Sequence, residues 1–138
     1  DLSRSAIMLL DPARQVYRVK ASLSARESNR LAGFVMPART GADLAYLALE
    51  KNVDIYIDNP RDAKIASRLP DWIRSHGAHP FFLLPIAAAD GTALGLLYGQ
   101  QWNDVKLTKE ELGQLAILRE LLQARLRRDA MGMPDTAG

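Results

Sequence analysis

The chain of 138 residues contains no cysteine. This absence excludes disulfide bonds, thiolate nucleophiles, thiolate metal ligands and thioether-linked cofactors in one step. A protein without disulfides is compatible with the cytosol, so we expect a cytoplasmic location. We predict no bound cofactor.

Long apolar runs are also missing. The longest strongly apolar stretch, residues 81–89, is far shorter than the roughly 20 residues that a membrane-spanning helix needs. We therefore predict no contact with a membrane. No signal peptide is visible. Because the first residue is Asp1 rather than Met, we expect an excised piece of a larger protein, whose other domains would be partners.

The chain has little excess charge, with a formal net charge of +2. Four arginines gather near the C-terminal end, at positions 119, 125, 127 and 128. A nucleic-acid surface usually needs a wider basic stripe, often with aromatic residues between the charges. Basic residues at the end of a helix complement the helix dipole, so we predict no nucleic-acid partner.

What the chain does contain is a succession of short apolar segments with the period of two that β-strands show. Ser5 to Leu10 is a candidate buried strand, and the alternating segment 15–23 follows it after a turn at Asp11–Arg14. Residues 53–57 alternate again. Two apolar runs, 80–88 and 93–101, flank the dipeptide Asp90–Gly91, which favours a hairpin turn. Pro85 in the first run lacks an N–H group, which indicates a bulge or an unpaired position.

Helical spacing marks the remaining segments. It predicts helices over residues 41–52 and 61–69, the second capped by Asp58 or Asn59, and a further one that begins at Pro70. Thr108 and Glu111 form a capping box before a long apolar stripe at residues 112–126. Residues 24–38 are predicted to form a loop with some helix, and residues 131–138 a disordered tail.

This order predicts one domain over residues 1–130. Consecutive hairpins favour an α+β fold with a central, mainly antiparallel sheet of about five or six strands, and helices packed on it.

Four passages in this order resemble a GAF domain: the opening hairpin SAIMLLDPARQVYRVKASL, the segment VDIYIDNPRD, the closing hairpin FFLLPIAAADGTALGLLYG, and the final helix LTKEELGQLAILRELLQARL. The segment KNVDIYIDNPRDAKIASRLPDWI is most similar to the GAF-like C-terminal region of bacterial HDOD signalling proteins. The resemblance implies a GAF/PAS-like fold. It also implies a first helix, most of which is missing ahead of the opening strand.

The resemblance implies a regulatory module that binds a small molecule on one face of the sheet, or that only mediates dimerisation. The Asn-Lys-Phe-Asp-Glu signature of the cyclic-nucleotide relatives cannot be placed here. The attachment cysteine of the bilin relatives is missing, and so are the cysteines of free methionine sulfoxide reductase. The candidate ligand-binding residues lie in and opposite the segment that would cover the pocket: Asp58, Arg61, Arg68, Trp72 and Tyr98.

Several of these candidates could instead have a purely structural role. Trp72 would cover the sheet as core, because aromatic residues on amphipathic helices usually serve packing. The arginines near it, together with Lys64, would form a solvated face. Trp102 is a second aromatic residue that could contact a ligand.

Catalytic and metal-binding patterns are weak. His76 and His79 give half of a possible metal site without enough partners, and a solvated loop explains them better. The carboxylates Asp54, Asp58, Asp62 and Asp71 are predicted to cap helices or face solvent rather than to act as acid and base. We predict no metal, no catalytic residue and no enzymatic activity. An uncharacterised enzyme is the weakest of the alternatives.

The last helix is predicted to mediate self-association. Its apolar residues cover more of the helix circumference than one contact with a sheet needs, and an exposed apolar strip usually marks a partner surface. A two-fold pairing is the simplest closed solution. We predict a homodimer with an interface formed by Leu118, Leu121, Leu122 and Arg125. A domain that only dimerises, without a ligand, is the main alternative function.

Overall fold

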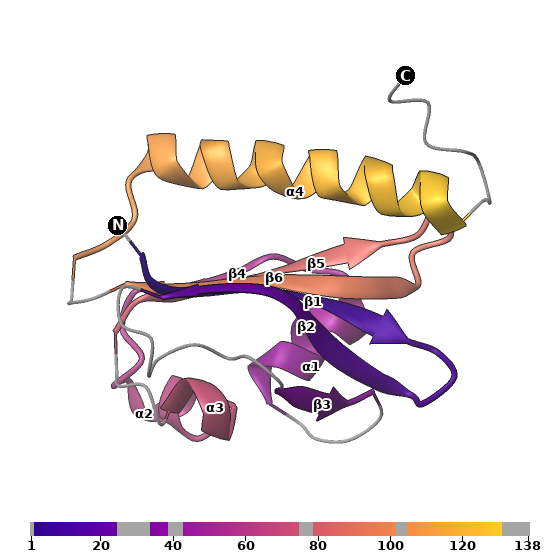
Figure 1. Cartoon of the computed structure of the whole chain (residues 1–138). Coiled ribbons are helices and arrows are strands. Elements are labelled where there is room, and N and C mark those ends of the chain that lie inside the picture. The colour runs from indigo at the N-terminus through magenta and orange to yellow at the C-terminus, as the bar shows by residue number, and fades with distance from the viewer. Residues whose placement is uncertain (1, 25–33, 39–42, 75–78, 102–104, 131–138) are drawn as a thin grey trace.

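The structure is a computed structural model, and it describes residues 2–24, 34–38, 43–74, 79–101 and 105–130. These residues form a six-stranded sheet in the order β3-β2-β1-β6-β5-β4, in which every pair of neighbours is antiparallel. One long helix covers one face and three short helices lie on the other (Figure 1). This arrangement confirms the predicted α+β fold with a sheet of five or six strands.

The first hairpin consists of β1 (Leu2–Asp11) and β2 (Val16–Ser24), and β3 (Val35–Pro37) adds to its outer edge. The turn is held by the Asp11 carboxylate, which accepts a hydrogen bond from the Arg14 amide. Two predictions need correction. The first strand begins at Leu2 rather than Ser5, and residues 35–37 form a strand where a loop with some helix was predicted.

The hairpin of β5 (Phe81–Ala87) and β6 (Ala93–Gln101) forms as predicted, and β6 pairs with β1 in the middle of the sheet. Gly91 has a φ of 90°, which favours glycine. The Asp90 carboxylate accepts a hydrogen bond from the Thr92 amide at 3.0 Å, which closes the turn. The outer strand β4 (Ile55–Ile57) pairs only with residues 81–83 of β5.

Three short helices lie on one face: α1 (Leu44–Lys51), α2 (Ala63–Ala66) and α3 (Asp71–Arg74). The Asp43 carboxylate caps α1 through the Tyr46 amide. Asp62 caps α2 through the Lys64 amide, so the predicted cap at Asp58 or Asn59 is wrong. The helix predicted at 61–69 is also shorter, because its cap, Asp62, follows the turn at residues 58–60 and the helix begins only at Ala63.

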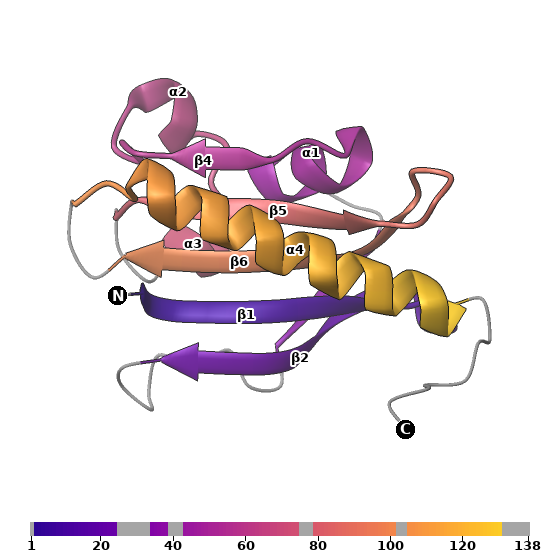
Figure 2. The same cartoon turned by 90° about the horizontal axis from the view of Figure 1, so that it is seen from above.

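The long helix α4 (Lys109–Ala130) begins with the predicted capping box. The Thr108 amide donates to Glu111 Oε1 at 2.9 Å, and the Glu111 amide donates to Thr108 Oγ1 at 3.1 Å. The helix runs obliquely across the sheet (Figure 2). Over the described ranges, we find no helix with the length and apolar character that crossing a membrane would need.

The alternation of side chains divides the core between the two faces of the sheet. Along β5, Phe81 and Leu83 face the short helices, while Phe82 and Leu84 face α4. The cluster under the short helices is the larger of the two and includes the fully buried Ile73 of α3. The cluster under α4 is small, and its covering residues, Leu107 and Leu115 among them, are only partly buried.

Candidate functional site

A charged residue lies inside the larger core. Arg4 follows a register irregularity between Leu2 and Arg4 in the pairing of β1 with β6, and its exposed fraction is only 6%. It precedes Ala6 and Met8 at the spacing of two that places all three on the face under the short helices. This residue was not predicted as part of the site, because the sequence placed it ahead of the first strand.

The guanidinium of Arg4 connects three elements. Its Nε and Nη2 atoms donate to the hydroxyl oxygen of Tyr98, in β6, at 3.1 and 3.0 Å. Nη2 also donates to the main-chain carbonyl oxygen of Trp72, in α3, at 2.5 Å. Arg4 therefore ties the central strands β1 and β6 to the short helix above them.

The network continues along the sheet. The Tyr98 hydroxyl donates to Gln100 Oε1 at 2.5 Å, and Gln100 Nε2 donates to the carbonyl oxygen of His79 at 3.3 Å. Burial raises the pKa of Tyr98 to about 12, against a smaller lowering by Arg4. Tyr98 therefore stays protonated at neutral pH, able both to donate and to accept.

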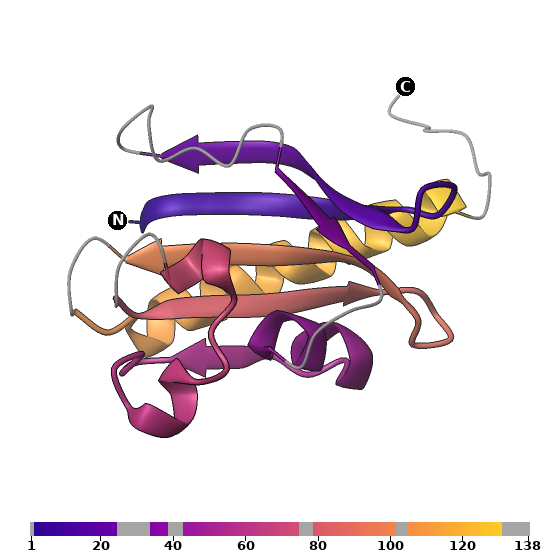
Figure 3. The ribbon, with the colours of Figure 1, turned by 90° about the horizontal axis from the view of Figure 1, so that it is seen from below.

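Aromatic rings surround this polar group. The ring of Trp72 meets the ring of Tyr98 edge-on, with centroids 4.8 Å apart, and lies 5.6 Å from the ring of Phe34. The Arg4 Cζ atom lies 5.4 Å from the centre of the Tyr98 ring. Figure 3 shows α3 lying across the strands β5 and β6. The site combines a cation with flat apolar surfaces.

The structure brings together two of the five predicted ligand-binding residues, Trp72 and Tyr98. The other three are exposed on the surface. Asp58 lies 3.8 Å from Lys106 in an ion pair, and the described hydrogen bonds of Arg4 do not involve Arg61 or Arg68. A role in binding stays a prediction for all five.

The predicted histidine pair is described only in part, since His76 lies outside the described residues, as does Trp102. His79 contributes its main-chain carbonyl to the network. Within the described ranges, no group of three or more histidine, aspartate or glutamate side chains could hold a metal ion. Of the four carboxylates, Asp62 is a helix cap and Asp71 pairs with Arg74.

The opposite face of the sheet carries a second, differently partnered arginine. Arg119 of α4 donates to both carboxylate oxygens of Asp54, at 2.6 and 3.0 Å, and its Nη1 also donates to the Pro85 carbonyl oxygen at 3.1 Å. The hydrogen bonds to Asp54 hold the pKa of Arg119 above its usual range. This pair fixes α4 to the edge of the sheet.

Two further side chains of α4 bind the exposed backbone of β5. The Ala87 amide donates to Gln123 Oε1 at 2.9 Å, and Arg127 Nε donates to the Ala87 carbonyl at 2.8 Å. Because β4 pairs only with residues 81–83, these backbone groups have no strand beside them on that side. The same gap explains Pro85, whose missing N–H group costs no bond to β4.

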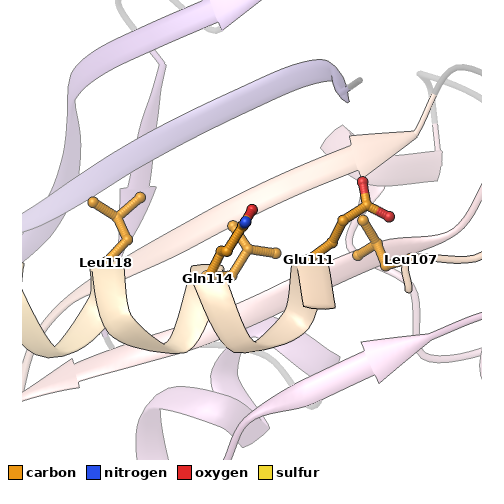
Figure 4. Close-up of a pocket in the computed structure, with 5 residues that line it drawn as sticks. Leu107, Glu111, Gln114 and Leu118 are labelled. Atoms are coloured by element: carbon orange, nitrogen blue, oxygen red, sulfur yellow. The ribbon is translucent and has the colours of Figure 1, made fainter. Parts of the chain in front are cut away.

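The outer surface of α4 is apolar over part of its length. The exposed fractions of Ile117, Leu118 and Leu121 are 63%, 42% and 65%, whereas Leu122 is partly buried. The predicted interface residue Arg125 is exposed and pairs with Asp129 at 3.5 Å. A groove of about 290 Å³ adjoins this strip along α4, as Figure 4 shows, and it is lined by Leu107, Glu111, Gln114, Leu115 and Leu118.

A six-stranded antiparallel sheet with a long helix on one face and short helices on the other defines an α+β fold. No family model matches the chain, and no curated protein does. Solved structures do match. The GAF domain of a phosphoenolpyruvate-protein phosphotransferase from Acinetobacter is 18% identical, with a TM-score of 0.69 over 98% of this chain and 76% of that chain.

Two other matches come from different proteins. A methyl-accepting chemotaxis protein is 20% identical, with a TM-score of 0.72 over 92% of this chain and 79% of that chain. A type II free methionine-R-sulfoxide reductase from Thermoplasma acidophilum is 14% identical, with a TM-score of 0.63 over 93% of this chain and 80% of that chain. These similarities establish that the chain has the GAF fold expected from its sequence.

Proposed function

We propose that this chain is a regulatory, sensory domain of a larger bacterial signalling protein, of the kind that accompanies an HDOD domain. In this proposal it binds a small molecule against the sheet face under α3. The observation that carries the proposal is the cluster of Arg4, Tyr98 and Trp72, where a cation and a neutral phenol meet beneath an aromatic side chain.

Core packing alone gives no reason for this cluster. Replacing buried charged groups by well-packed apolar residues often leaves stability unchanged or increases it. An apolar side chain would therefore stabilise the core under α3 at least as well as Arg4 does. Binding sites combine apolar walls with a few convergent polar groups. A similar structure comes from a methyl-accepting chemotaxis protein, and by analogy this favours a sensory role.

We propose further that the domain is not an enzyme. The reductase that shares the fold does not change this, because thiol-based sulfoxide reduction needs a cysteine and the chain has none. A general acid or base works best with a pKa near the operating pH. Burial moves the pKa of Tyr98 to about 12, away from neutrality, so Tyr98 suits binding better than proton transfer.

A second function, which does not require a ligand, is homodimerisation through α4. The observation in its favour is the strip of Ile117, Leu118 and Leu121, of which two residues are more than 60% exposed. Exposed apolar patches of this kind usually mark interaction surfaces. In this proposal a two-fold axis pairs the α4 helices of two chains.

Fluorescence of Trp72 gives a direct test of ligand binding. The chain has two tryptophans, so the variant Trp102→Phe leaves Trp72 as the only reporter. Compounds extracted from protein purified from cells should change its emission when they are added back to ligand-free protein. Trp72→Phe, which lacks this reporter and is followed by native mass spectrometry, should lose binding. If no extracted compound changes Trp72 emission, and native mass spectrometry shows only the bare chain, the ligand-binding proposal fails and the dimerising module remains.

A further inference from the structure

The described contacts of Arg4 leave its charge without an opposite charge. Its partners are the Tyr98 hydroxyl, the Trp72 carbonyl and the Tyr98 ring, all of them neutral. No ion pair between Arg4 and a carboxylate is found among the described residues. Buried charges in proteins are normally paired, so Arg4 departs from the rule.

The comparison with Arg119 makes this departure clear. The side chain of Arg119 is 14% exposed and still holds two carboxylate oxygens of Asp54. Arg4 is more deeply buried, at 6%, and has none. Among the described residues, Arg119, which fixes α4, is therefore paired with a carboxylate. Arg4, which lies under α3, has no such partner there.

One edge of the Arg4 guanidinium is also open. A guanidinium carries five N–H donors, and the hydrogen bonds above use Nε and Nη2. Nη1 makes no hydrogen bond to the described residues. Every fully buried side-chain nitrogen or oxygen atom in the described part of the chain has a hydrogen-bond partner. Because Nη1 has none there, it is accessible to solvent.

We propose that Arg4 binds the oxyanion, carboxylate or phosphate, of a small organic ligand, with Nη1 donating to it. This inference rests on the proposed function and names its ligand class. Arginine N–H groups form strong charge-assisted hydrogen bonds with carboxylate and phosphate oxygens. The ring centres of Trp72 and Phe34 lie 5.6 Å apart. These rings provide apolar surfaces against which a flat apolar part of the ligand can pack.

The rest of the network holds Arg4 in position for this task. The hydroxyl of Tyr98 accepts from two guanidinium nitrogens, and it can do so because its own proton goes to Gln100. The guanidinium is therefore oriented before any ligand arrives, which reduces the entropy lost on binding. Tyr98 and Gln100 are positioning residues in this arrangement.

The test uses matched acids and amides of the same shape on the Trp102→Phe protein: benzoate against benzamide, and indole-3-acetate against indole-3-acetamide. Binding is followed at millimolar concentrations by Trp72 emission and by melting temperature. We expect each acid to bind about tenfold more tightly than its amide, since a charge-assisted hydrogen bond is lost in the amide. Inorganic phosphate, which has no flat part, should bind more weakly than the acids.

Three variants make the test specific. Arg4→Met should remove the preference for acids, and Arg128→Met, at an exposed position on α4, is the matched control that should keep it. Arg4→Lys retains the charge and should keep a reduced preference, which covers the case in which Arg4→Met fails to fold. Acids that bind no more tightly than amides, or that do not bind, overturn the anion assignment, as does an equal loss in Arg128→Met. Amides that bind beside Trp72 without an acid preference would leave the proposed function intact.

Discussion

The two faces of the sheet use buried arginine in different ways. Under α4, Arg119 pairs with Asp54 and with the edge of β5, and these contacts join the helix to the sheet. Under α3, the contacts of Arg4 with described residues are all to neutral groups, inside a larger core. Arg119 therefore belongs to a structural ion pair within the chain. An opposite charge for Arg4 must come from outside the described residues.

The largest expected effects come from the apolar residues that pack the two faces. Phe81 and Phe82 are adjacent in β5 and equally buried, each at 1% exposure, on opposite faces. Replacing either by alanine should destabilise the domain by about 3 to 5 kcal/mol. Phe81→Ala should cost more, because α4 can settle into the space that Phe82 leaves, whereas the larger core is enclosed. Chemical denaturation of both variants measures this, and an equal or reversed order would contradict it.

Alkaline pH should act most strongly on the α3 face, where Tyr98 is fully buried. The pKa of Tyr98 is raised from 10.0 to about 12, so the unfolded chain loses the hydroxyl proton first. Stability from this group is fully present below pH 10 and falls as the pH rises toward 12, by about 2 to 3 kcal/mol in total. The free energies of unfolding of the unsubstituted chain and of Tyr98→Phe, measured by urea titration, should diverge between pH 10 and pH 12. Parallel pH curves for the two proteins would refute the assignment to Tyr98.

The two arginines should differ when each is replaced by methionine. Arg119→Met leaves Asp54 without its partner and should cost about 2 kcal/mol. Arg4→Met removes a buried charge that has no carboxylate to lose, and should cost only about 1 kcal/mol. Thermal and urea unfolding give both values. The contrast between the faces would disappear if Arg4→Met proved the more damaging change.

The smallest effect on stability is expected on the outer surface of α4. Leu118→Glu and Leu121→Glu change exposed side chains and should alter the free energy of unfolding by no more than about 0.5 kcal/mol. They should nevertheless convert a dimer into monomers, as measured by analytical ultracentrifugation. Val105→Glu, at a position that is 62% exposed outside the helix, is the matched control. A dimer that survives both leucine variants would place the interface elsewhere.

Local patterns were enough to predict most of the framework. The capping box of Thr108 and Glu111 and the hairpin turn at Asp90–Gly91 both form as the sequence indicates. Each depends on atoms within three residues of one another, so a short stretch of sequence contains all the partners. Strand β3 was missed because three residues ending in Pro37 show too little alternation to mark a strand.

The candidate site was only half predictable. Trp72 and Tyr98 could be proposed from a likeness to GAF domains, and the structure places their rings in contact. Arg4 could not, because an arginine ahead of an apolar run resembles an ordinary solvated terminus. Its partners lie 94 and 68 residues away in the sequence, and no periodicity connects positions so far apart.

The sequence by itself therefore determined the elements, their order and the antiparallel hairpins, since these follow from interactions between near neighbours. Only the tertiary structure decided which charges are paired. Arg119 and Asp54 are 65 residues apart, and they meet because the sheet places β4 under α4. Arg4 has no carboxylate partner among the described residues for the same physical reason: the sheet sets its neighbours, and those neighbours are a phenol, a carbonyl and an aromatic ring.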